Sequence, residues 1–170
     1  MGLEVEDRLK VYELEREQWV PRPLTEVFDF FSRAEHLGRI TPPWLNFRIR
    51  TPVPIEMRVG ALIDYTIRLA GLPLAWRTRI THWQPESRFV DEQVRGPYAL
   101  WHHTHTFASH DRGVLVADRI RYALPLGPLG RVAHALALRP ALCAIFDYRF
   151  RSIRELLGGR FTPPTPRPRS

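Results

Sequence analysis

Apolar and polar residues alternate along most of the chain between positions 8 and 124. A period of two is typical of β-strands, because successive side chains of a strand point to opposite faces. The segments with this pattern are 8–20, 44–50, 61–69, 74–83, 88–94, 101–107 and 114–124. Short stretches of turn-forming residues separate them, for example at 95–97 and 110–113. The pattern therefore predicts a meander of roughly six to seven antiparallel strands.

Two short helices are predicted directly after the first strand. Apolar residues spaced at i, i+3, i+4 and i+7 from Leu24 to Phe31 form one stripe of a helix. Leu37 and Ile40 indicate a second helix, which the proline pair at 42–43 should end, because proline cannot continue a helix.

A longer helical pattern covers residues 128–157. Pro140 lies inside it, so we expect either a kink or two abutting helices at that point. The glycine pair at 158–159 is a suitable C-terminal stop. We therefore expect one domain over residues 1–158, followed by a Pro- and Arg-rich tail over 159–170 that the composition predicts to be disordered.

The order of these elements predicts an α+β fold. A single meander has to bury its apolar face against another element, and the long C-terminal helix is the one large enough to cover it. The length of 170 residues is sufficient for one such domain with a substantial core.

Sorting each strand into its two faces places polar residues among aromatic ones on the inner face. In 88–94 the pattern leaves two choices for the inner face. Phe89 shares one face with Asp91, and Val90 shares the other with Glu92. If Phe89 points inward, the polar residues of the inner face are Asp91, Gln93, His103, His105 and Asp118. The aromatic residues that we expect around them are Phe28, Phe31, Tyr65, Trp76, Phe89, Trp101, Phe107, Tyr122 and Phe146.

Arginine dominates the outer face and the overall charge. The formal net charge is +7, and Lys10 is the single lysine. The residues assigned to the outer face are Arg68, Arg77, Arg79, Glu92, His102, Arg119 and Arg121. We favour a solvated face stabilised by cross-strand ion pairs over a nucleic-acid surface, because single-strand readers interleave exposed aromatic rings with the cations. Contact with nucleic acid or anionic membranes is expected to be weak and non-specific.

Composition excludes several classes of protein. No apolar run reaches the roughly 18 residues that a membrane-spanning helix needs, and the first residues carry no apolar signal segment. The single cysteine, Cys143, excludes an intrachain disulfide and disfavours a cysteine-based zinc site. These observations predict a cytoplasmic protein.

The run 76–107, with its FVDEQ…GPY…W-x-H-x-H-x-F spacing, together with DRIRYALPLG at 118–127 and IFDYRFRSIREL at 145–156, resembles a known family. It is similar to the bacterial ligand-binding subfamily of the SRPBCC superfamily, also called START or Bet v 1-like. The resemblance covers the chain except the tail. It implies a helix-grip fold, in which a curved antiparallel sheet wraps around the C-terminal helix and encloses a deep cavity. Members bind lipids, sterols, quinones or polyketides, and some are cyclases or aromatases.

The histidine-rich segment WHHTHTF, residues 101–107, admits three interpretations. His103 and His105 with Asp91 and Asp118 are of the residue types that bind zinc or iron. They are equally suited to hydrogen bonding with each other, which satisfies buried polar groups. A histidine beside a carboxylate could also act as a general base. From sequence we favour the hydrogen-bonded interpretation, with no metal and no cofactor.

The sequence therefore predicts binding of a hydrophobic or amphipathic small molecule, such as a lipid, a quinone or a polyketide-like compound. The polar and aromatic inner-face residues named above, fourteen positions from Phe28 to Phe146, are the expected contacts. A cyclase- or hydrolase-like enzyme using the same cavity is the first alternative, and no nucleophile motif decides between them. An anion- or nucleic-acid-binding role of the arginine face is the second. Oligomeric state and ligand identity stay open.

Overall fold

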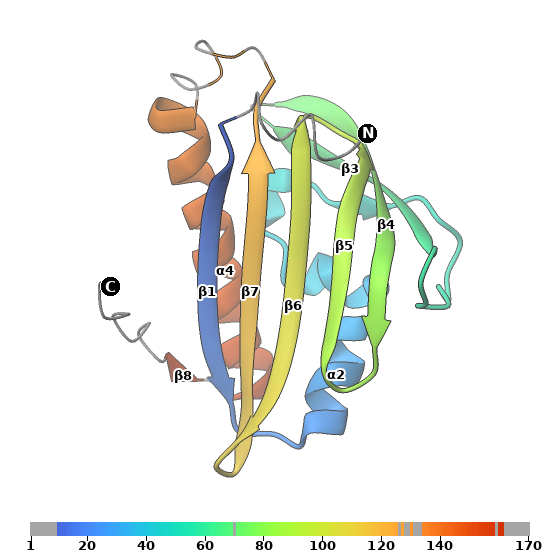
Figure 1. The fold of residues 1–170 in the computed structure, drawn as a ribbon, viewed down its shortest axis with the longest axis vertical. Coiled ribbons are helices and arrows are strands. Elements are labelled where there is room, and N and C mark those ends of the chain that lie inside the picture. Colours follow the sequence, from blue (N-terminus) through green and yellow to red (C-terminus); the bar gives the residue numbers. More distant parts are fainter. Residues whose placement is uncertain are drawn as a thin grey trace.

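A computed structural model describes residues 10–69, 71–125, 127, 130, 134–158 and 160–161 (Figure 1). The strands are β1 (Tyr12–Val20), β2 (Arg48–Ile49), β3 (Leu62–Leu69), β4 (Leu72–Gln84), β5 (Arg88–Arg95), β6 (Leu100–His110), β7 (Gly113–Ala123) and β8 (Arg160–Phe161). The helices are α2 (Leu24–Ser32), the 3₁₀-helices η1 (Ala34–Arg39) and η2 (Pro43–Leu45), the π-helix η3 (His134–Leu138) and α4 (Arg139–Leu157).

The strands form one antiparallel sheet of eight, in the order β2-β3-β4-β5-β6-β7-β1-β8. Consecutive strands from β2 to β7 are neighbours, which is the predicted meander. The first strand closes the order by pairing with β7. Two strands, β2 and β8, have only two residues each. Figure 1 shows α4 and α2 on the same side of the curved sheet, so the predicted helix-grip fold is confirmed.

Apolar side chains on that inner side form separate clusters. Phe28 of α2 packs edge-on against Phe107 of β6, and it also contacts Trp83 and Phe89. The C-terminal half of α4 adds Ile153 to this cluster. A second cluster joins the first half of α4 to β7, and a third joins η1 to β3 and β4. These clusters hold the two helices against the sheet.

The segment 44–50 is mostly not a strand, contrary to the sequence prediction. Residues 43–45 form the 3₁₀-helix η2, and only Arg48–Ile49 pair with β3. Asn46 has a left-handed backbone with φ of 43°, which interrupts an extended chain. Asparagine tolerates this conformation better than most residues, so the local backbone overrides the alternating pattern.

The C-terminal helix changes type near Pro140. A π-helical turn over residues 134–138 runs directly into α4, and Pro140, the second residue of α4, lies at this junction, where its missing N–H removes one bond from the helical ladder. Gly158 ends α4 with φ of 77°, as predicted. Apart from residue 130, the expected start of this helix at 128–133 lies outside the described residues, as does most of the predicted disordered tail. Within the tail, Arg160–Phe161 pair with β1, which the sequence did not predict.

Candidate functional site

A cavity of about 190 Å³ lies between the inner face of the sheet and α4. Most of its wall is apolar, and the aspartate, histidine and arginine side chains of the wall come from β5, β6 and α4. The expected contacts that line it are Phe31, Tyr65, Trp76, Phe89, Asp91, Trp101, His103, His105 and Phe146. The structure therefore brings aromatic and polar residues from distant segments to one cavity.

The other expected contacts are engaged elsewhere. Phe28 and Phe107 belong to the cluster beneath α2. Gln93 holds the β5–β6 turn, since its amide donates to the carbonyl of Tyr98 at 2.8 Å. The Tyr122 hydroxyl lies 2.8 Å from His134 Nε2.

Pairing between β5, β6 and β7 brings the polar residues together. Asp91 is directly opposite His103, and His105 is directly opposite Asp118. Because directly paired residues point to the same face, the four side chains form one cluster. His103, His105 and Asp118 are 5%, 3% and 8% exposed, so the cluster is buried.

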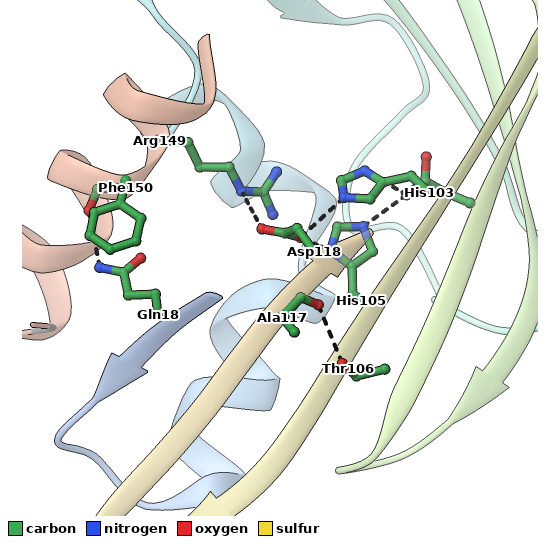
Figure 2. A network of polar contacts seen from close by, with 9 residues as sticks. Gln18, His103, His105, Thr106, Ala117, Asp118, Arg149 and Phe150 are labelled. Atoms are coloured by element: carbon green, nitrogen blue, oxygen red, sulfur yellow. Dashed lines mark hydrogen bonds and ion pairs between the residues drawn. The ribbon is translucent and has the colours of Figure 1, made fainter. Parts of the chain in front are cut away.

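Short contacts connect the cluster (Figure 2). His103 Nε2 donates to Asp118 Oδ1 at 3.0 Å, and His105 Nε2 donates to Asp91 Oδ2 at 2.9 Å. His105 Nδ1 also lies 2.8 Å from Asp118 Oδ1, at an angle too poor for a hydrogen bond. The hydrogen bonds expected from the sequence between these histidines and carboxylates are therefore present.

The sequence did not single out Arg149, which completes the cluster from α4. Its Nε lies 3.8 Å from Asp118 Oδ2, and its guanidinium lies over the rings of Phe31 and Phe146. A helical period would have indicated it, because Leu142, Phe146 and Arg149 lie on one face of α4 at i, i+4 and i+7.

Burial and charge separate the two histidines. Burial lowers the pKa of His103, and the neighbouring His105 lowers it further. Burial also disfavours the charged form of His105, but the contacts with Asp118 and Asp91 prevail and raise its pKa. Arg149 and the histidines overcome the opposing effect of burial and hold the pKa of Asp118 well below its ordinary value.

Three buried side-chain nitrogen atoms of cavity-lining residues have no hydrogen-bond partner in the described structure. They are Trp76 Nε1, His105 Nδ1 and Arg149 Nε, of which the last two lie 2.8 and 3.8 Å from carboxylate oxygens of Asp118. A buried donor without a partner costs about 1–3 kcal/mol. A ligand with an acceptor oxygen would remove that cost.

The outer face carries paired charges. Arg77 binds both carboxylate oxygens of Asp64 at 2.7 and 2.9 Å, and Arg119 binds both of Glu13 at 2.8 and 3.0 Å. These contacts are the cross-strand pairs that the sequence favoured over a nucleic-acid surface.

Binding of single-stranded DNA or anionic vesicles is expected to be weak and to disappear as salt approaches physiological concentration, because the attraction is electrostatic and screened. Fluorescence anisotropy against a salt series measures it. Tight binding that persists at physiological salt, and that Arg77→Ala combined with Arg79→Ala abolishes, would assign this face a nucleic-acid role.

None of the helices in the described ranges is both long enough and apolar enough to span a bilayer.

Fold and site together define a helix-grip protein with an apolar cavity and one polar wall. Residues 20–146 match the family described as polyketide cyclase / dehydrase and lipid transport, and the chain belongs to this family, within the SRPBCC superfamily. A comparison with curated proteins gives no match.

Solved structures share the fold. TTHA0849 from Thermus thermophilus has a TM-score of 0.65 at 17% identity, covering 86% of this chain and 97% of that one. The major latex-like protein 151 from Panax ginseng has a TM-score of 0.60 at 11% identity, covering 86% and 97%. A nucleoside-diphosphate sugar epimerase from Corynebacterium glutamicum has a TM-score of 0.60 at 26% identity, covering 85% of this chain but 29% of that protein. The last similarity is therefore to one part of a larger chain.

Proposed function

We propose that the protein binds a hydrophobic or amphipathic small molecule, such as a lipid, a quinone or a polyketide-like compound, in the cavity beneath α4. The observation that carries this proposal is an apolar cavity whose polar groups gather on one wall. Ligand sites typically combine an apolar lining with a few convergent polar groups that fix orientation.

Aromatic rings make the apolar wall. Trp76 stacks on Tyr65 with ring centroids 5.8 Å apart and meets Trp101 edge-on at 5.4 Å. Trp101 also contacts Tyr98 at 4.7 Å. A ligand that covers this wall removes apolar area from water at about 25 cal/mol per Å², before the cost of association.

The polar wall would set selectivity. Asp91, His103 and His105 face the cavity, and Trp76, which also lines it, has an N–H without a hydrogen-bond partner in the described structure. A ligand with a hydroxyl or carbonyl oxygen at one end would satisfy these groups, whereas a pure hydrocarbon would leave them unpaired at about 1–3 kcal/mol each.

Truncating the two walls is expected to have different effects. Trp101→Ala should weaken binding across a panel of lipids, quinones and aromatic polyketide-like compounds, because it removes apolar contact area. His103→Ala should mainly change which compounds are preferred. Tryptophan quenching and thermal shift measure both effects.

The control is His102→Ala, since His102 is adjacent in sequence but points to the outer face toward Glu92. This variant should bind like the unchanged protein. If a genuine ligand is found and neither Trp101→Ala nor His103→Ala changes its affinity or ranking, the ligand binds outside this cavity and the proposal fails.

A cyclase- or hydrolase-like enzyme using the same cavity is the second candidate. The observation that favours it is the imidazole of His103 on the cavity wall, oriented by its 3.0 Å hydrogen bond to Asp118. An oriented histidine of this kind can move a proton to or from a bound substrate. Mass spectrometry of the same panel after incubation distinguishes the candidates, because a binder returns its ligand unchanged.

A further inference from the structure

Asp91, His103 and His105 converge on one point of the cavity wall. Each offers one potential ligand atom, and these atoms all lie within 4.8 Å of one another. Within the described ranges, no other group of three or more His, Cys, Asp or Glu residues converges in this way. The three side chains come from the adjacent strands β5 and β6, which fix their backbones rigidly.

The separations between these atoms suit ligands of a single ion. An ion about 2.1 Å from each of two ligand atoms holds them roughly 3.0 Å apart at a right angle and roughly 3.6 Å apart at 120°. His105 Nε2 lies 2.9 Å from Asp91 Oδ2, and His103 Nδ1 lies 3.6 Å from the same oxygen. The first separation is also a hydrogen-bond distance, so a proton bridging these atoms occupies the place that an ion would take.

The opposite ring nitrogens provide the support that metal-binding histidines need. His103 Nε2 donates to Asp118 Oδ1 at 3.0 Å, and His105 Nδ1 lies 2.8 Å from the same oxygen, an ion-pair contact without hydrogen-bond geometry. A carboxylate on the far nitrogen is the usual partner of a ligating histidine, because it orients the ring and increases its basicity. Asp118 borders a smaller hollow with Gln18 and Arg149, whereas the three converging residues line the main cavity.

We propose that Asp91, His103 and His105 bind a divalent transition-metal ion, Zn²⁺ or Fe²⁺, and that Asp118 is the positioning residue for both histidines. Two imidazoles and one carboxylate are a ligand set suited to these ions, and three protein ligands leave coordination positions for an outside oxygen. Because the site lies on the cavity wall, that oxygen would belong to water or to a bound ligand, which the ion would polarise.

A metal site would add to ligand binding a property that the sequence alone did not favour. The sequence indicated hydrogen-bonded histidines without a metal, and the hydrogen bonds are present. The structure adds the convergence of three ligand atoms and a single carboxylate behind both rings. Elemental analysis of protein purified without a histidine tag distinguishes a metal-free cluster from a metal-bound one. We expect about one zinc or iron per chain.

A Co²⁺ titration of chelator-stripped protein tests the residues. We expect one Co²⁺ per chain by calorimetry, visible d–d absorption, and a higher thermal midpoint, since an ion that binds only the native state stabilises it. His105→Gln and Asp91→Asn should abolish the absorption. Asp118→Asn should weaken affinity about 10- to 100-fold while keeping the absorption, because it removes support and not a ligand.

His102→Gln and His110→Gln are the matched controls. Both residues belong to β6; His102 faces Glu92, and His110 is exposed beside Asp111. Circular dichroism establishes that each variant is folded. If a variant does not fold, the Co²⁺-dependent thermal shift of the unchanged protein still tests whether the metal binds. The proposal is overturned if the unchanged protein binds no stoichiometric Co²⁺, or if a control variant loses as much binding as His105→Gln. Since the probe is the metal alone, neither result depends on finding the organic ligand.

Discussion

Replacing Asp118 with alanine is expected to lower the free energy of unfolding by about 3–5 kcal/mol, which is the usual cost of removing one partner from a buried ion pair. The carboxylate is buried, lies 3.0 Å from His103 and 2.8 Å from His105, and faces Arg149 at 3.8 Å. Without it, the guanidinium loses the carboxylate that faces it, His103 loses its hydrogen-bond acceptor, and His105 loses an ion-pair contact. Urea unfolding followed by circular dichroism measures the change.

Asp147→Ala is the matched control for this variant. Asp147 also forms an ion pair, with Arg16 at 3.8 Å, but its side chain is 59% exposed. Exposed pairs contribute about 0–1 kcal/mol, so this variant should unfold close to the unchanged protein. Equal effects of the two substitutions would show that the buried cluster contributes no more to stability than a surface contact.

Replacing Phe28 with alanine, tested separately, is also expected to cost about 3–5 kcal/mol, because it removes a large buried ring. Phe28 lies at the centre of the cluster that joins α2 to the sheet, with ring centroids 5.2 Å from Phe107 and 5.4 Å from Trp83. The loss should combine transfer free energy with the cost of the cavity left behind. Thermal and urea unfolding measure it.

Phe28→Leu calibrates that result. Leucine keeps most of the apolar volume, so its effect should be clearly smaller than that of alanine. A loss below about 1 kcal/mol for Phe28→Ala, well under the usual range for a buried aromatic ring, would mean that α2 is not held to the sheet by this ring. Phe31, which belongs to the same helix and lines the ligand cavity, would then have to be held in place by other contacts.

Strand alternation predicted most of the inner face correctly. Every second residue from Val114 to Tyr122 on β7 and from Trp101 to Phe107 on β6 points inward, as the period of two indicated. The choice that the pattern left open in β5 was decided by packing. Phe89 stacks on His105 with centroids 4.2 Å apart, which turns Asp91 toward the histidines.

Predictions from the sequence were wrong or incomplete where the structure depends on a local backbone conformation or on a residue far away in the chain. A left-handed Asn46 interrupts the expected strand over 44–50 and leaves only Arg48–Ile49 extended and paired, and alternation of side chains carries no signal of such a backbone. Arg149 was missed because its role depends on how α4 lies on the sheet, and Asp118 is 31 positions away in the chain. The expected contacts Gln93 and Tyr122 face inward but are engaged by a turn and by His134.

By itself, then, the sequence determined the class of fold, the inner face of most long strands, and the residue types that meet there. These properties follow from the periods of strand and helix, which neighbouring residues encode. Only the tertiary structure decided strand register and the position of α4. These two features determine which of the inward residues reach the cavity. They also determine which atoms come within contact distance among Asp91, His103, His105 and Asp118. Those distances depend on packing between segments far apart in the chain, where a shift of a single residue would turn every side chain to the other face.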